Sequence, residues 1–253
     1  MDELFKTILI AIVAFLYSAV GHGGATGYIA ILSLFGLAHD QVAGTTLLLN
    51  TCVAGLSLFF FARAGQLNMR LALPFLLLSV PMAFVGAKLK IDQQTFHYIL
   101  AGVLILSALR FIFVDTSKVK GKPAEEATLE EATFKAPPMP LALTVGGSLG
   151  LMSGIVGIGG GVFLSPIMIF CRFADVKQTS AASALFIVAN SISGLLGRYL
   201  EQRLDFYQPG NYLPVAIIAA LAGGYLGAGR FSSRVLQIIL GVVLLVASTR
   251  LLV

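Results

Sequence analysis

Charged residues are scarce in this sequence, and that scarcity excludes an ordinary soluble domain. Asp, Glu, Lys and Arg make up 11% of the 253 positions, whereas about 25% is usual in soluble domains. Hydrophobic residues make up 57%, and several apolar runs reach the roughly 20 residues that a helix needs to cross a bilayer. The composition therefore predicts an integral membrane protein.

Residue patterns that support catalysis or metal binding are also missing. The two cysteines, Cys52 and Cys171, lie far apart in the sequence, so neither a disulfide framework nor a metal site is expected. The sequence lacks a His-Glu-x-x-His motif and the serine-bearing glycine motif of hydrolases, and no apolar run pairs an acid with a histidine. We therefore expect neither enzyme activity nor a bound metal.

The net charge of +5 does not indicate binding to nucleic acid. Basic residues are scattered at the ends of apolar runs instead of lying along one polar face. Residues placed in this way anchor helices at the membrane surface, so the expected partner is a lipid bilayer and not a nucleic acid. Arg63 and Arg198, which end corresponding runs, are interpreted as interfacial anchors, and His39 and His97 as interfacial residues.

Apolar runs separated by polar breaks predict an all-α protein of about eight helical segments. The segments are 4–36, 41–62, 71–89, 95–114, 140–171, 177–200, 212–230 and 233–252. We expect a first transmembrane repeat at 1–114, a polar linker at 115–139 and a second transmembrane repeat at 140–253. Most Lys and Arg residues fall on the linker's side, which predicts a multi-pass protein of the bacterial inner membrane with the linker in the cytoplasm.

The two halves of the chain resemble each other, which indicates an internal duplication. The run Val-Gly-His-Gly-Gly at 20–24 aligns with Val-Gly-Ile-Gly-Gly at 156–160, and Leu73-Pro74 aligns with Leu213-Pro214. Repeats of this kind are common in membrane transporters, where paired broken helices mark the binding site.

The first segment of each half is longer than one membrane crossing and contains a glycine cluster. Glycine costs about 1 kcal/mol relative to alanine inside a helix, so we expect the helix to break there. The piece from Thr26 to Leu37 would be only about 18 Å long, which fits a re-entrant hairpin better than a second crossing. A hairpin leaves three crossings in each half and so predicts inverted repeats, whereas a single crossing would make the halves parallel.

Backbone groups freed by a break must face protein or a wet cavity, because bare groups in hydrocarbon cost several kcal/mol each. The short helices that start near Thr26 and Val162 would present N–H groups and a positive dipole end, which favours an anion. The opposite ends, near Val20 and Val156, present carbonyl groups that suit a cation. The breaks therefore predict a binding site that favours anions without excluding cations.

His22 is the one ionisable residue at a predicted break, which makes it a candidate proton carrier or substrate donor. Alternatively, it is a neutral histidine that satisfies the broken backbone. Hydroxyl and amide side chains on the second segment of each half are candidate anion donors or, equally, contacts between packed helices. The predicted substrate-binding residues are Gly21, His22, Gly23, Gly24, Ala25, Thr45, Thr46, Asn50, Gly157, Gly159, Gly160, Gly161, Ser180, Ser183 and Asn190.

The glycine run from Val156 to Gly161 with the following Pro166, its weaker copy at Gly21 to Gly24, and the two halves around a polar linker resemble the sulfite exporter TauE/SafE family. The resemblance spans essentially the whole chain. It implies a transporter of sulfur-containing anions without an organic cofactor, and it places the paired glycine regions in the central pathway.

The broken helices predict a membrane transporter of a small anion, and the family resemblance implies that the anion contains sulfur, such as sulfite or a sulfonate. The expected mechanism is alternating access around a midplane site between the two broken helices, with proton coupling left open. A passive anion channel and a transporter of a different small anion remain the alternatives. A homodimer is as compatible with the sequence as a single copy.

Overall fold

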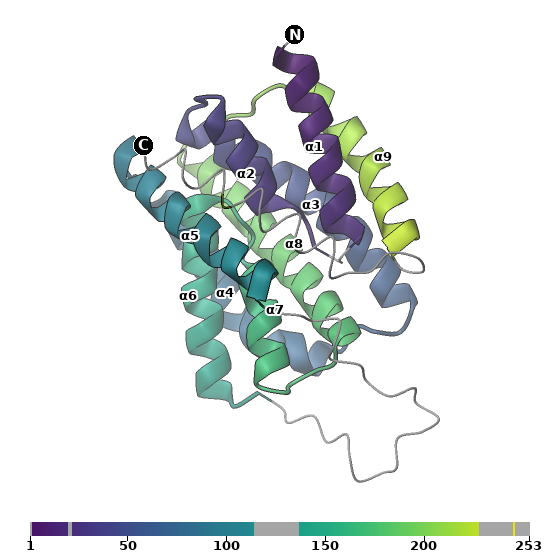
Figure 1. Ribbon diagram of the computed structural model, residues 1–253. Helices are drawn as coiled ribbons and strands as arrows, with labels where there is room; N and C mark the ends of the chain where they lie inside the picture. Colours follow the sequence, from purple (N-terminus) through teal and green to yellow (C-terminus); the bar gives the residue numbers. More distant parts are fainter. Residues whose placement is uncertain (1, 20–21, 114–136, 228–244, 246–253) are drawn as a thin grey trace.

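The computed structural model describes residues 2–19, 22–113, 137–227 and 245, and this part of the chain is helical without any strand (Figure 1). The all-α prediction is confirmed. The helices are α1 (Asp2–Ala19), α2 (Ala25–Leu34), α3 (His39–Arg63), α4 (Met69–Lys88), α5 (Gln93–Phe113), α6 (Met139–Val156), α7 (Gly161–Phe170), α8 (Val176–Leu200) and α9 (Pro209–Gly227). The predicted eighth segment, apart from Leu245, and most of the predicted linker lie outside the described residues.

Helices at matching positions in the two halves have matching lengths. α1 and α6 have 18 residues each, α2 and α7 have 10, and α3 and α8 have 25. In Figure 1, α1 descends from the N-terminus and α2 climbs back, whereas α6 climbs and α7 descends. This arrangement is the one that the hairpin interpretation requires; the inverted repeat itself stays a prediction.

The helices of each half of the chain pack mainly against helices of the other half. α1 packs against α9, α6 packs against α4, and α3 and α8 pack against each other. The first helix of one half therefore lies beside the fourth helix of the other. The two halves are interlocked, and α3 and α8 form the central contact between them.

Glycines allow the interlocked helices to approach closely. Gly146, Gly150 and Gly154 are four residues apart and so share one face of α6, and a Cβ at any of them would collide with a backbone carbonyl of α4. A Cβ on Gly223 of α9 would likewise collide with the backbone carbonyl of Phe15 on α1. Small residues in this spacing are the usual way in which membrane helices pack backbone to backbone.

The outer surface of the helices suits a lipid environment. Four helical stretches in the described part of the chain are long and apolar enough to cross a membrane: His39–Arg63, Met69–Lys88, Met139–Val156 and Lys177–Leu200. Large apolar side chains point outward, including Leu77, Leu106 and Ile218, which are 53%, 60% and 68% exposed. A surface this apolar would aggregate in water, whereas lipid chains cover it without cost.

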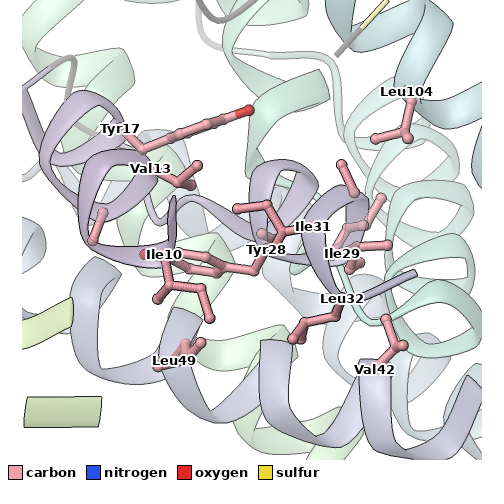
Figure 2. Close-up of a cluster of buried hydrophobic side chains, with 14 of the residues drawn as sticks. Ile10, Val13, Tyr17, Tyr28, Ile29, Ile31, Leu32, Val42, Leu49 and Leu104 are labelled. Atoms are coloured by element: carbon pink, nitrogen blue, oxygen red, sulfur yellow. The ribbon is translucent and has the colours of Figure 1, made fainter. Parts of the chain in front are cut away.

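The short helix α2 is enclosed by other helices. Its residues from Ala25 to Ser33 are all buried. Figure 2 shows Tyr28, Ile29 and Leu32 of α2 among side chains of α1, α3 and α5. A helix buried on all sides needs no polar face, and this enclosure keeps the broken backbone beside it away from lipid.

Candidate functional site

Only glycine can occupy the last position of the first glycine break. Gly24 has a φ of 96° in the left-handed region and stands immediately before α2. Its carbonyl accepts hydrogen bonds from the N–H groups of Gly27 and Tyr28, both at 3.0 Å, and a Cβ on Gly24 would meet the Tyr28 ring at 2.8 Å. Backbone conformation and lack of space therefore both require glycine here. Gly21, also predicted for the site, lies outside the described residues.

The second break contains three residues with positive φ. Gly157 ends α6 with a φ of 88°, and Gly159 and Gly160 follow with 71° and 73° before α7 begins. Neither Gly160 at the start of α7 nor Gly24 at the start of α2 provides a side-chain cap. The first N–H groups of both short helices are thus left without the side-chain acceptor that usually satisfies them.

One small cavity lies where the two breaks meet. Residues of α1, α2, α3 and α8 and of both breaks surround it: Tyr17, His22, Gly23, Gly24, Ala25, Thr26, Asn50, Ile158, Val162 and Ile187. The centre of a water molecule has about 10 Å³ in which to move, which is roughly the room that one water needs. A sulfite ion is larger than this space, so the cavity is too small for sulfite in the described conformation.

Asn50 of α3 lies between the two breaks. The side chain is fully buried, and its Nδ2 donates a hydrogen bond to the Ile158 carbonyl at 3.2 Å, which fixes the orientation of the amide. Its Oδ1 has no hydrogen-bond partner among the described residues. A Cβ on Gly23 would collide with Oδ1, and a Cβ on Gly159 would lie 2.6 Å from Nδ2. Both glycines are therefore needed to make room for this amide.

His22 begins a chain of hydrogen bonds that leads from the cavity into α7 and α8. Its Nε2 lies 3.0 Å from the Ser165 hydroxyl, which in turn lies 2.8 Å from the Ser183 hydroxyl. Ser165 also hydrogen bonds with the Gly161 carbonyl at 3.1 Å. The predicted residue Ser183 does not line the cavity but is linked to His22 through Ser165, which was not among the predicted site residues.

Several predicted site residues lie elsewhere in the structure. Gly157 packs against Ala43, because a Cβ on it would lie 2.9 Å from the Ala43 Cα. The hydroxyl of Thr45 accepts a hydrogen bond from the backbone N–H of Tyr207 at 2.8 Å. The remaining predicted residues that are buried but do not line the cavity are Thr46, Gly159, Gly160, Gly161, Ser180 and Asn190. Direct substrate contact for all of these residues stays an untested prediction.

Sequence reasoning missed five residues that line the cavity: Tyr17, Thr26, Ile158, Val162 and Ile187. The hydroxyls of Tyr17 and Thr26 are hydrogen bonded to each other. Thr26 and Val162 are the second residues of α2 and α7. A position-by-position comparison of the halves would have selected them together.

The interfacial interpretation of Arg198 and His39 is wrong, because both side chains are buried inside the protein. Arg198 is 1% exposed and donates to Oδ1 of Asp40 at 2.8 Å and to the Ile155 carbonyl at 3.1 Å. His39 is 6% exposed and lies within 3.0 Å of the same carbonyl. Arg203 donates to Asp40 at 2.6 Å. The carboxylate of Asp40 and the carbonyls that end α6 together compensate the buried guanidinium.

Comparison with known proteins agrees with this architecture. The family model described as Sulfite exporter TauE/SafE matches residues 7–251. The probable membrane transporter protein y4hK of Sinorhizobium fredii is 33% identical, over 99% of this chain and 98% of its own length. The probable membrane transporter protein YdhB of Bacillus subtilis is 26% identical, over 92% and 93%. No solved structure matches the chain. The match along nearly the whole sequence shows that this membrane transporter belongs to the sulfite exporter TauE/SafE family.

Proposed function

We propose that the protein carries small sulfur-containing anions, such as sulfite or sulfonates, across the membrane by alternating access. The observation that supports this proposal best is the meeting of two uncapped helix starts, those of α2 and α7, near one buried cavity. Family membership adds the expectation of a sulfur oxyanion. The substrate would occupy the cavity between the breaks.

The chemistry of the cavity suits an anion that must leave the site again. No Lys or Arg stands among the described residues that line it, so an anion there would be held by backbone N–H groups and neutral side chains. Each helix start contributes about 0.3–1 kcal/mol and more when partly buried. Donors of this strength offset the loss of hydration without forming an ion pair too strong to release.

A cavity smaller than its proposed substrate requires a movement before the substrate can enter. Ion pairs and hydrogen bonds join the two halves near the N-terminal end of the bundle, where Asp40 of α3 meets Arg198 and Arg203. Glu3 and Tyr207 are joined at 2.6 Å in the same way. Transport would break such contacts at one end while the other end closes, which is the motion that alternating access needs.

Transport by purified protein in lipid vesicles tests the proposal. We expect saturable uptake of labelled sulfite or methanesulfonate, and its loss in Gly23→Val and Gly159→Val, because the added side chains would collide with Asn50. Gly102→Val is the matched control, since a Cβ at Gly102 meets nothing within 4 Å. Normal uptake by both site variants would refute the proposed pathway.

Electrical recording separates a transporter from a passive channel. A carrier that changes conformation in each cycle moves few ions per second and gives no single-channel steps. Discrete steps of current in planar bilayers would instead identify a channel that uses the same glycine breaks.

A further inference from the structure

The cavity between the two breaks contains a buried hydrogen-bond acceptor that lacks a donor. The amide of Asn50 is fully buried, and its Nδ2 donates to the Ile158 carbonyl, so the amide cannot turn round and offer an N–H group instead. Its Oδ1 lies against Gly23, which lines the cavity, and has no partner among the described residues. A buried acceptor in this state indicates a donor or a positive charge beside it.

Further oxygen atoms surround the same space. The hydroxyls of Tyr17 and Thr26, which both line the cavity, are hydrogen bonded to each other, and each oxygen retains a lone pair because that bond uses only one proton. Helices α1 and α6 end at Ala19 and Val156, directly before the breaks, and the last carbonyls of a helix have no partner within it. In transporters with broken helices, such helix ends coordinate sodium ions.

The size of the cavity suits a small cation better than an anion. It has room for about one water molecule, and a sodium ion without its hydration shell is smaller than that, whereas sulfite is larger. Hard cations prefer oxygen ligands such as amide, carbonyl and hydroxyl groups. Among the described residues that line the cavity there is no Lys or Arg that would repel a cation and no Asp or Glu that would hold it too tightly for release.

The proposed anion needs a countercharge in the same place. A charge that leaves water for a protein interior loses much of its hydration energy unless an opposite charge accompanies it. The helix starts of α2 and α7 carry only partial positive charges, and the described lining residues include no cationic Lys or Arg. A cation bound beside Asn50 supplies the missing positive charge.

We propose that the cavity binds one sodium ion, with Asn50 Oδ1 as a ligand and the Tyr17 and Thr26 hydroxyls beside it, and that this ion accompanies the anion in each transport cycle. The inference rests on the proposed transport of an anion. Once the helices move to admit the anion, the sodium ion and the N–H groups that begin α2 and α7 hold it together. Binding of either ion therefore strengthens binding of the other.

Sodium binding to purified protein in the absence of any anion tests the site itself. We expect radioactive sodium to bind to wild-type protein, and Na⁺ to raise the melting temperature, whereas K⁺ at the same ionic strength does not. Asn50→Ala should weaken Na⁺ binding about tenfold or more, because it removes an oxygen that contacts a charge. Thr26→Val is a second variant, in case Asn50→Ala does not fold.

Ser107→Ala is the matched control for these variants. Its hydroxyl is also fully buried, but it donates to the Val103 carbonyl within α5 and does not line the cavity. The control should bind Na⁺ like wild-type protein. Absence of Na⁺ binding in the wild type, or unchanged binding in both folded cavity variants, would overturn the sodium site.

Uptake of labelled sulfite into vesicles tests the coupling. We expect uptake to rise with an inward Na⁺ gradient and to fall when an organic cation replaces Na⁺. In Asn50→Ala the Na⁺ concentration for half-maximal uptake should rise about tenfold or more, while uptake at saturating Na⁺ persists. Reduced uptake at every Na⁺ concentration, with no change in the half-maximal concentration, would indicate a structural role for Asn50 and overturn its assignment as a ligand.

The outcomes also separate this inference from the proposed function. Equal sulfite uptake in Na⁺, in K⁺ and in an organic cation would overturn the coupling and leave anion transport intact, with water as the donor to Asn50. Protein that transports no sulfur-containing anion in any of these salts would overturn the proposed function and the coupling with it. The binding measurement without anion would still decide the sodium site.

Discussion

The guanidinium of Arg198 at the end of α8 lies 2.8 Å from the carboxylate of Asp40 at the start of α3. The pair joins the two halves of the chain, and the arginine is almost completely buried, at 1% exposure, whereas Asp40 is 35% exposed. Removal of the carboxylate leaves a buried charge without its partner, which is among the more destabilising changes that one substitution can make.

Asp40→Asn is therefore expected to lower the free energy of unfolding by roughly 2 kcal/mol, less than for a fully buried pair because Asp40 is partly exposed. Thermal unfolding in detergent measures the change. Glu201→Gln is the control, since Glu201 pairs with Lys88 and both side chains are substantially exposed; its effect should stay under about 1 kcal/mol. Equal losses of the free energy of unfolding in the two variants would show that the burial of Arg198 does not strengthen the effect.

Gly150→Leu is expected to prevent α6 from packing against α4, because even a Cβ at Gly150 would collide with the Ser79 carbonyl. The yield of monodisperse protein in size-exclusion chromatography should fall severalfold. Gly102→Leu introduces the same side chain where a Cβ meets nothing within 4 Å and should preserve the yield. A normal elution profile for Gly150→Leu would show that the helices can separate without loss of the fold.

His22→Gln tests whether transport is coupled to protons. Glutamine keeps a side chain that can hydrogen bond with Ser165 but cannot gain a proton near neutral pH. If His22 carries protons, uptake by the variant should persist while its dependence on pH flattens. An unchanged pH profile would remove His22 from coupling and leave it as a residue that satisfies the broken backbone.

Asn50→Asp is expected to reduce anion uptake at least about tenfold, because a carboxylate in place of the amide would repel the substrate inside a buried site. Asn50→Ala, which removes the amide without adding charge, should have a smaller effect. Uptake measured at several substrate concentrations distinguishes weakened binding from slower turnover. Comparable losses in the two variants would mean that charge at this position does not govern substrate affinity.

The sequence predicted the breaks because glycine clusters are a local signal. Few residues other than glycine tolerate the left-handed backbone conformation. It is adopted by Gly24, Gly157, Gly159 and Gly160. The clusters of glycine in the sequence were therefore enough to indicate that the helices end there. The correspondence of the halves then placed both breaks at one site. Asn50 followed from the cluster of hydroxyl and amide side chains on the second segment of each half.

The position of Ile187 at the cavity and the burial of Arg198 could not be predicted in the same way. Ile187 resembles every other isoleucine in a membrane helix until the fold shows that it faces the cavity. Arg198 stands near the end of an apolar run, as an anchor would, and its partner Asp40 is far away in the sequence. Such pairings depend on which helices meet, and local patterns carry little information about that.

The packing of helices of one half against helices of the other half also limits the order in which contacts between helices can form during synthesis. α1 leaves the ribosome before the other described helices, yet its main neighbour is α9, the last complete helix in the described part of the chain. Most of the chain must therefore be translated before α1 gains that neighbour. Until then the face of α1 that packs against α9 remains open to lipid, to the insertion machinery or to another nascent chain.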